Sequence, residues 1–351
     1  MLARLFVIVG GLLVLVLLAA LAVPPFIDWT GYRADFEREA SAILGRKGTV
    51  RGDATARLLP FPSVTFTDVV VSGGAEGQPA MTVDTFSMDA ELAPFLRGEV
   101  LIFDMRLERP RATIAIGEDG MVDWAMRPSS PFDPAQIAIE KLTVSDGEVE
   151  VRHGAGGRVH TLSGVDATVS ARSLLGPWRV DGAMLFDGLR TEISASTGRV
   201  GDDGHMRLRL RARPHGLAAT MESDCNARME KGALFYAGQF RLTEDEASPV
   251  QLRGSDGEAV AVAPVKAAPG YRASGKFQLD HRRLSLDEFR FETGPLDNPY
   301  AADGTASLDL GPEPRFRIEA SGAQVQFDEA VSGEGGPALS AEARIAALET
   351  A

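Results

Sequence analysis

Residues that could perform chemistry are few and scattered along this chain of 351 residues. The five histidines form no HxH, HExxH or His-Cys spacing, so the sequence predicts no metal site. His153 and His160 flank the glycine-rich segment 154–157, which reads as a solvent-exposed turn. Cys225 is the only cysteine, which excludes an intrachain disulfide and a thiolate metal cluster.

Motifs for nucleotide binding and acyl transfer are also missing from the sequence. It contains no GxxxxGK[ST] phosphate loop and no GxSxG nucleophile turn. Carboxylate pairs such as Asp202-Asp203 and Asp245-Glu246 fall in predicted turns or loops, where solvation accounts for them. A glycosidase pair stays open, because its two carboxylates can come from distant strands. We predict that the protein is not an enzyme, with no catalytic residues and no cofactor.

The longest apolar segment, Leu5 to Val23, lies at the start of the chain. As a helix it would extend about 28 Å, close to the hydrocarbon thickness of a bilayer. Pro24-Pro25 end it, and Arg4 before it favours a cytoplasmic N-terminus. A cleaved signal peptide is the alternative, since Ala20-Leu21-Ala22 is similar to a cleavage site. We predict an uncleaved single-pass anchor over residues 1–27. Its membrane-facing residues are Leu5, Phe6, Leu12, Leu13, Leu15, Leu17, Leu18, Leu21 and Val23.

Composition restricts the partners of the remaining chain. The hydrophobic share of 44% is ordinary for a folded protein, and the formal net charge is −13. With this acidic balance and no basic stripe, the sequence argues against nucleic-acid binding. The missing disulfide in an exported body is more typical of a bacterial periplasm than of a small secreted scaffold.

Beyond the anchor, the apolar periodicity changes from helix to strand. Residues 28–48 carry an apolar stripe at helical spacing and predict an amphipathic helix. From Thr49 onward apolar residues recur at every second position, most clearly in His205–Arg213, where four arginines alternate with Met206, Leu208, Leu210 and Ala212. Such a strand has one polar and one apolar face. Asp-Gly pairs at 119, 146, 181, 187, 203, 256 and 303 predict hairpin turns.

These patterns predict a mainly β protein: a long antiparallel meander curled into an elongated groove, with β-sandwich domains as the alternative. We expect a first β segment over 49–126, a proline-rich linker over 127–136 and a second β segment over 137–351. An acidic, Ala- and Pro-rich insertion at 244–270 is predicted to be mobile. The helical composition of 340–351 has no stop signal, so we expect the chain to continue.

Several turn and packing motifs resemble those of the AsmA family. The first group follows the anchor: Tyr32-Arg33, Ile43-Leu44-Gly45-Arg46, Val50-Arg51-Gly52, Leu59-Pro60-Phe61-Pro62-Ser63-Val64 and Asp68-Val69. The second group is Ala93–Glu99, Leu107–Pro110, Asp119–Trp124 and Gly294–Tyr300 with Asp303-Gly304. None of these motifs is catalytic. The resemblance implies a periplasmic protein held in the bacterial inner membrane, with a β body similar to chorein-type bridge proteins that take part in phospholipid traffic.

From the pattern and the resemblance together we predict a protein that moves or shields phospholipids between the inner and outer membranes. The alternative is a non-enzymatic structural or assembly factor for outer-membrane proteins. Its predicted partners are membrane phospholipids and other envelope proteins. The candidate lipid-contact residues are Val64, Phe66, Phe86, Met88, Ile114, Ile116, Val149, Val151, Met206, Leu208, Leu210, Phe316 and Ile318.

Overall fold

A computed structural model describes most of the chain between residues 31 and 322. The described residues are 31, 34–35, 37–38, 41, 46–74, 77–95, 97–123, 133–201, 203–215, 219–244, 252–253, 259–260, 270–294 and 299–322. The first strands are β1 (Gly48–Val50), β2 (Ala54–Arg57), β3 (Ser63–Val71), β4 (Met81–Ala90), β5 (Val100–Glu108), β6 (Arg111–Ile116) and β7 (Val122–Asp123). The next are β8 (Ile137–His153), β9 (Arg158–Ala171), β10 (Trp178–Phe186), β11 (Leu189–Thr197), β12 (His205–Pro214), β13 (Ala219–Glu230) and β14 (Ala233–Glu244). The last are β15 (Leu252–Arg253), β16 (Ala259–Val260), β17 (Tyr271–Leu279), β18 (Arg283–Thr293), β19 (Tyr300–Asp309) and β20 (Arg315–Gly322). Short helices are α3 (Leu92–Phe95), η4 (Pro134–Gln136) and η5 (Gly154–Gly156).

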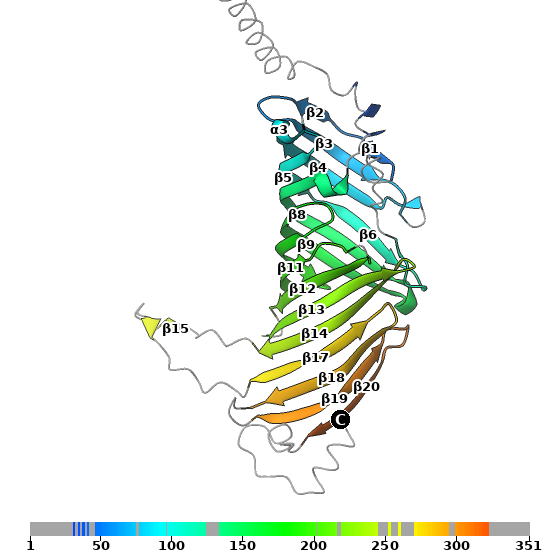
Figure 1. Ribbon diagram of the computed structural model, residues 1–351, viewed down its shortest axis with the longest axis vertical. Coiled ribbons are helices and arrows are strands. Elements are labelled where there is room, and N and C mark those ends of the chain that lie inside the picture. The colour runs from blue at the N-terminus through cyan, green and yellow to red at the C-terminus, as the bar shows by residue number, and fades with distance from the viewer. Residues whose placement is uncertain are drawn as a thin grey trace, which may run out of the picture.

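Eighteen of these strands form one continuous sheet, which runs the length of the molecule in Figure 1. From β8 to β14 and from β17 to β20, each strand pairs antiparallel with the next, and β14 pairs with β17. β15 and β16 pair only with each other. The prediction of a mainly β, largely antiparallel meander is therefore confirmed. Apart from β15 and β16, the described strands of both predicted β segments belong to the same sheet.

One part of the sheet is parallel, which the prediction of an antiparallel meander missed. β5 and β6 both run parallel to β8, with Leu107 opposite Val144 and Ala112 opposite Val149. The two strands act as one long strand broken at Arg109-Pro110, where Arg109 has a φ of 46° and proline has no amide hydrogen to donate. The chain then returns to the start of this long strand before β8 begins, and such a return forces parallel pairing.

The Asp-Gly pairs divide into two groups, so the prediction that they are all hairpin turns was partly wrong. Asp187-Gly188 forms the β10–β11 turn with φ values of 46° and 86°, as a type I′ turn requires. In contrast, Asp146-Gly147, Asp181-Gly182 and Asp303-Gly304 lie inside β8, β10 and β19. The pair 256–257 lies outside the described residues.

Glycines inside the strands mark where the sheet bends. A Cβ added to Gly182, Gly238, Gly275 or Gly304 would come closer than 3.0 Å to the backbone of the neighbouring strand. At Gly238 it would also overlap Cβ of Cys225, the residue directly opposite. Opposite Cβ atoms normally stand about 4.5–5.5 Å apart, so the strands converge on the face that these glycines share. The sheet therefore curves toward that face.

Two small clusters of buried residues lie in the first half of the sheet. One contains Ile102, Ile137, Ile139 and Ala171, with Trp178 and others packed against it. The other contains Val50, Ala54 and Phe66. Branched side chains suit these positions because they fill the space above a pleated surface. This half of the sheet thus has the packing of an ordinary protein core.

Several predicted segments lie largely or wholly outside the described residues. They are the anchor Leu5–Val23, most of the linker 127–136, most of the insertion 244–270 and the final segment 340–351. Of the predicted helix 28–48, the described residues 34–35, 37–38 and 41 are helical. Two of them bind the first strand: the backbone N–H of Val50 donates to Glu37 Oε1 at 2.8 Å, and that of Gly48 donates to Ser41 Oγ at 2.9 Å.

Candidate functional site

One face of the sheet carries an unbroken row of apolar and small side chains. Residues that lie directly opposite one another on paired strands share a face, so the row can be followed through the strand register. It takes one residue from each of fourteen strands, β3 to β5, β8 to β14 and β17 to β20: Phe66, Phe86, Leu107, Val144, Ala167, Gly182, Ile193, Ala212, Met221, Leu242, Ala273, Phe291, Ala302 and Gly322. We call the face that bears this row the apolar face.

The opposite face is polar over the same distance. One chain neighbour of each residue in the apolar row belongs to a second row, on the opposite face. This second row contains no apolar residue. This row is Thr65, Ser87, Arg106, Thr143, Thr168, Asp181, Ser194, Arg211, Glu222, Arg241, Ser274, Arg290, Asp303 and Ser321. The sheet therefore separates its polar and apolar side chains from β3 to β20.

All of the predicted lipid-contact positions fall on the apolar face. Val64 lies opposite Met88, and Phe66 opposite Phe86. Ile114 lies opposite Val151, Ile116 opposite His153, and Val149 opposite Leu162. Met206, Leu208 and Leu210 alternate along β12, and Phe316 and Ile318 lie opposite Leu308 and Ala306 at the far end. The register thus brings these positions from distant parts of the sequence onto one surface.

The strands β13, β14 and β17 also contribute to this face, although none of the predicted lipid-contact residues lies in them. Phe240 lies opposite Ser223 and Gly275, and Tyr236 lies opposite Ala227 and Leu279. The signal was present, because Phe240 and Leu242 alternate with Gln239 and Arg241.

In the second half of the sheet the large apolar side chains are only half-buried. This holds for Leu208, Leu210, Phe240, Phe277 and Phe289. In contrast, the fully buried apolar residues from β10 to β20 are small: Ala219, Cys225, Ala227 and Ala233. Ala219, Cys225 and Ala227 belong to the apolar face and form its floor, and the larger residues project from it.

Two titratable residues of the apolar face, Cys225 and Tyr236, are shielded from water. Burial raises the pKa of the Cys225 thiol, and nearby Asp224 raises it further. Burial is also the main cause of the raised pKa of Tyr236. A thiol with a raised pKa stays protonated and is a poor nucleophile. Cys225 therefore behaves here as a small apolar residue.

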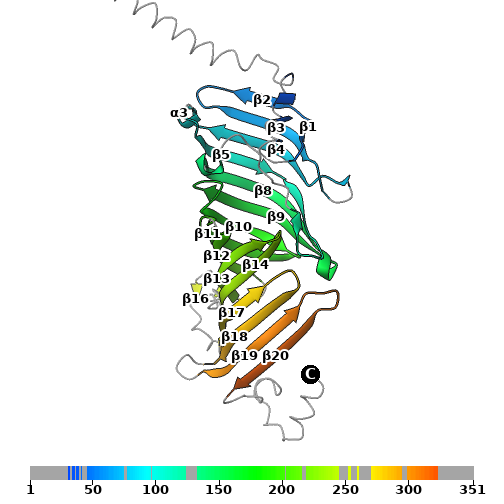
Figure 2. The same ribbon diagram turned by 45° about the vertical axis from the view of Figure 1, so that its right-hand side comes forward.

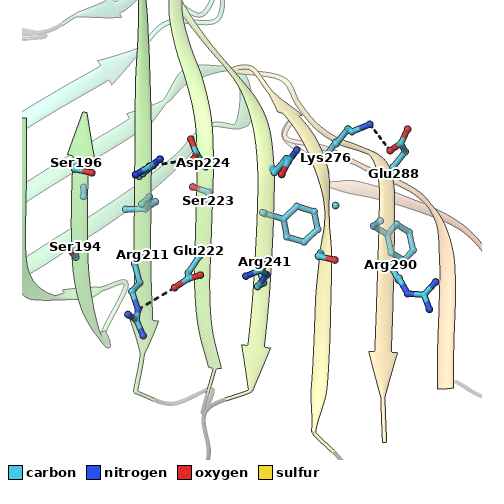
Figure 3. A pocket seen from close by; sticks show the side chains of 18 of the residues that line it. Ser194, Ser196, Arg211, Glu222, Ser223, Asp224, Arg241, Lys276, Glu288 and Arg290 are labelled. Carbon is cyan, nitrogen blue, oxygen red and sulfur yellow. Dashed lines mark hydrogen bonds and ion pairs between the residues drawn. The ribbon is translucent and has the colours of Figure 1, made fainter. Parts of the chain in front are cut away.

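Ion pairs between neighbouring strands neutralise the polar face. Asp224 Oδ2 accepts from Arg207 Nη2 at 2.6 Å and from Arg209 Nε at 3.1 Å. The hydrogen bond from Arg207 is the largest cause that lowers the Asp224 pKa to about 2, and Arg209 adds to it. Figure 3 shows two further pairs, Arg211 with Glu222 and Lys276 with Glu288. These side chains are largely exposed, so each pair contributes little to stability.

A hollow of about 1050 Å³ lies along β11 to β19. Three adjacent rows line it. The middle row belongs to the apolar face and contains Ala195, Leu210, Ser223, Phe240, Gly275, Phe289 and Gly304. The flanking rows, which include Arg211, Glu222 and Arg290, have their side chains on the polar face (Figure 3). The hollow spans many strands, as an extended surface does, and differs from the compact cavity of a small-molecule site.

Two of the histidines lie beside a carboxylate. His160 Nδ1 lies 2.7 Å from Asp187 Oδ2, and this pair lowers the Asp187 pKa. His215 Nε2 lies 3.0 Å from Glu192 Oε1. Over the part of the chain that the structure describes, no group of three or more His, Cys, Asp or Glu side chains could hold a metal ion.

Within the same described residues, no helix has the length and apolar character needed to cross a membrane.

Comparison with known proteins identifies the first half of the chain. The AsmA family model matches residues 1–173, a range that extends through β9 and slightly beyond it. No curated protein matches the chain. No solved structure matches it. The chain therefore contains an AsmA family domain over residues 1–173.

Proposed function

We propose that this chain is a periplasmic protein, anchored in the bacterial inner membrane, whose apolar face helps to move or shield phospholipids between the inner and outer membranes. In this role it supports outer-membrane biogenesis and catalyses no reaction. The observation that carries the proposal is the unbroken apolar row from Phe66 to Gly322. The AsmA family domain supports an envelope location.

Physical chemistry explains why such a row suits a phospholipid. Moving an acyl chain of about sixteen carbons into water costs about 13 kcal/mol, at about 0.8 kcal/mol for each buried CH₂. A lipid therefore needs a continuous apolar surface along its whole path. At about 4.8 Å for each strand, the row from β3 to β20 extends about 65 Å along the sheet. Half-buried side chains such as Leu210 and Phe289 are available to contact acyl chains.

Site-specific photo-crosslinking in cells tests this proposal. A photoreactive amino acid at Leu210 probes the apolar face, and the same amino acid at Arg209 is a matched control one residue away on the polar face. The Arg209 side chain is 61% exposed, so low accessibility would not explain a weak signal there. We expect phospholipid adducts at Leu210 and few at Arg209. Equal phospholipid capture at the two positions would contradict the proposal.

A specific observation also favours the assembly-factor alternative. Every residue of β20 is exposed, with Phe316 at 79% and Ile318 at 61%, and among the described strands it pairs with β19 alone. An exposed edge with large apolar side chains can accept a strand from another protein. A photoreactive amino acid at Ile318 tests this role: capture of an outer-membrane protein there, without phospholipid at Leu210, would favour the alternative over the lipid path.

A further inference from the structure

Turns from distant parts of the sheet meet along one side of the molecule. On one side of this meeting line are the β6–β7 turn (117–121) and the β8–β9 turn (154–157). On the other are the turns β13–β14 (231–232), β17–β18 (280–282) and β19–β20 (310–314). Figures 1 and 2 both show these turns close together, although several strands of the sheet separate them. We call this line of contacts the seam.

Backbone pairing forms the first contact of the seam. The Val122 N–H donates to the carbonyl oxygen of Gly232 at 3.2 Å, and Met121 lies opposite Ala233 in an isolated antiparallel bridge. The Met121 side chain also lies against Gly232, within 3.4 Å of the position that a Cβ there would take. β7 therefore touches the start of β14, although β8 to β13 lie between them in the sheet.

Side chains form the remaining contacts. His153 Nε2 lies 2.6 Å from the carbonyl oxygen of His281, and Arg282 Nη2 donates to the carbonyl oxygen of Glu118 at 3.2 Å. Arg158 Nη2 donates to the carbonyl oxygens of Leu310 and Gly311, at 3.0 Å and 3.4 Å. The seam thus joins the β8–β9 turn to the β17–β18 and β19–β20 turns.

These contacts have a consequence for the apolar face. The sheet curves toward that face, as Gly182, Gly238 and Gly275 show. When a curved sheet brings two of its borders into contact, the face on the inside of the curve is enclosed along that side. Between β8 and β18, the seam therefore closes one side of the apolar face.

The seam is also the place where polar groups are left unpaired. Among the described residues, three buried side-chain nitrogens have no hydrogen-bond partner: Arg158 Nε, His281 Nδ1 and His281 Nε2. All three belong to residues of the seam. A buried unpaired polar group is unfavourable, and opening the seam would let water satisfy it. The seam has a few isolated hydrogen bonds where the sheet has continuous ladders, so it is the weaker connection.

We propose that the seam is a side gate of the lipid path: it opens to admit the acyl chains of a phospholipid to the apolar face between β8 and β18, and it closes over them. The inference rests on the proposed function of the apolar face. It adds the route of entry, because a closed seam leaves that part of the face without access from this side.

A disulfide across the seam tests the gate. The double variant Met121→Cys/Ala233→Cys places two thiols at directly opposite positions, a geometry that a disulfide can bridge. Cys225 can remain, because its side chain is buried and its raised pKa makes it unreactive. The control variant Glu192→Cys/Arg213→Cys forms a disulfide between β11 and β12 on the polar face, away from the seam.

The measurement is uptake of a fluorescent phospholipid by the purified full chain from vesicles of phosphatidylethanolamine and phosphatidylglycerol. We expect the oxidised seam variant to take up lipid about tenfold more slowly than its reduced form, since a locked gate then limits entry. The oxidised control variant is expected to match the unsubstituted chain. Equal uptake by the oxidised and reduced seam variants would overturn the gate and leave the proposed function standing. If the unsubstituted chain takes up no lipid, both are overturned.

Hydrogen exchange tests the gate without lipid. If the seam opens spontaneously, the Val122 amide exchanges much faster than the Cys225 amide, which lies in β13 between two paired strands. Equal protection of the two amides would show a permanently closed seam and would contradict the gate.

Discussion

Several large apolar side chains are buried in the first half of the sheet, β1 to β9, whereas those described in the second half, β10 to β20, are half-buried or exposed. In the first half, Val71 is 0% exposed, and Val83, Ile102 and Ile139 are also buried. In the second half, the buried apolar residues are small, and Leu210, Phe240 and Phe289 remain half-exposed. Both halves have the same alternating pattern and share one face. The difference shows that a half of the sheet with an ordinary core continues into a half whose large apolar side chains are only partly covered by the described residues.

The largest effect is expected on stability, from a substitution in the buried core of the first half of the sheet. Ile102→Ala removes part of the buried cluster of Ile137, Ile139 and Ala171, and we expect it to lower the free energy of unfolding by about 3 kcal/mol. The matched variant Leu210→Ala, on the half-exposed surface, should cost about 1 kcal/mol. Urea unfolding of the two variants measures both values. Equal losses would contradict the difference between the halves.

The next largest effect on stability is expected from a substitution at a glycine where the second half of the sheet curves. Gly238→Ala places a Cβ against the backbone of Asp224 and Cys225, so the strands must move apart. We expect it to lower the free energy of unfolding by about 2 kcal/mol, as overpacking typically does. Gly311→Ala is the control, because a Cβ there meets open space and the residue's φ is not positive. If Gly238→Ala proves as mild as the control, the bend does not depend on close approach at this glycine.

A smaller effect is expected on lipid capture. Leu210→Asp puts a charge on the apolar face, and we expect phospholipid capture by a crosslinker at Leu208 to fall about tenfold, or about 1.4 kcal/mol. Ser196→Asp is the matched control, because it adds the same charge on the polar face opposite Arg209. Mass spectrometry of the crosslinked lipid compares the two variants. Equal reductions would indicate a general effect of charge and would argue against a role for the face itself.

The smallest effect concerns the ion pairs of the polar face. The Asp224 pKa is lowered to about 2, so Asp224 contributes stability above its ordinary pKa of about 4 and loses that contribution as the pH falls toward 2. Asp224→Asn should lower the folding equilibrium constant at neutral pH by less than about tenfold. Because the wild-type advantage disappears on acidification, the urea midpoints of the two proteins should converge at low pH. A difference that does not depend on pH would show that charge is not its cause.

The sequence already contained the two-faced character of the strands. The alternation in His205–Arg213 and in Val149–Val151 predicted strands with one apolar face, and β12 and β8 have that form. It also identified the candidate positions, because the period of two fixes which side chains share a face of a strand. The AsmA resemblance came from turn residues such as Asp119-Gly120, which the family match covers, and from Gly294–Tyr300, which lies outside it.

Only the tertiary structure decided how the strands combine. The sequence pattern was compatible with two packed sheets. The structure settled the arrangement, because all described strands except β15 and β16 pair in one continuous sheet. Glycines such as Gly182 and Gly304 were read as turn residues, yet they lie inside strands where the neighbouring backbone leaves no room for a Cβ. The seam joins residues more than a hundred positions apart, such as His153 and His281. The alternation within one strand determines which of its faces is apolar. The curvature of the sheet and the contacts of the seam depend on strands that are far apart in the sequence, so no local sequence pattern predicts them.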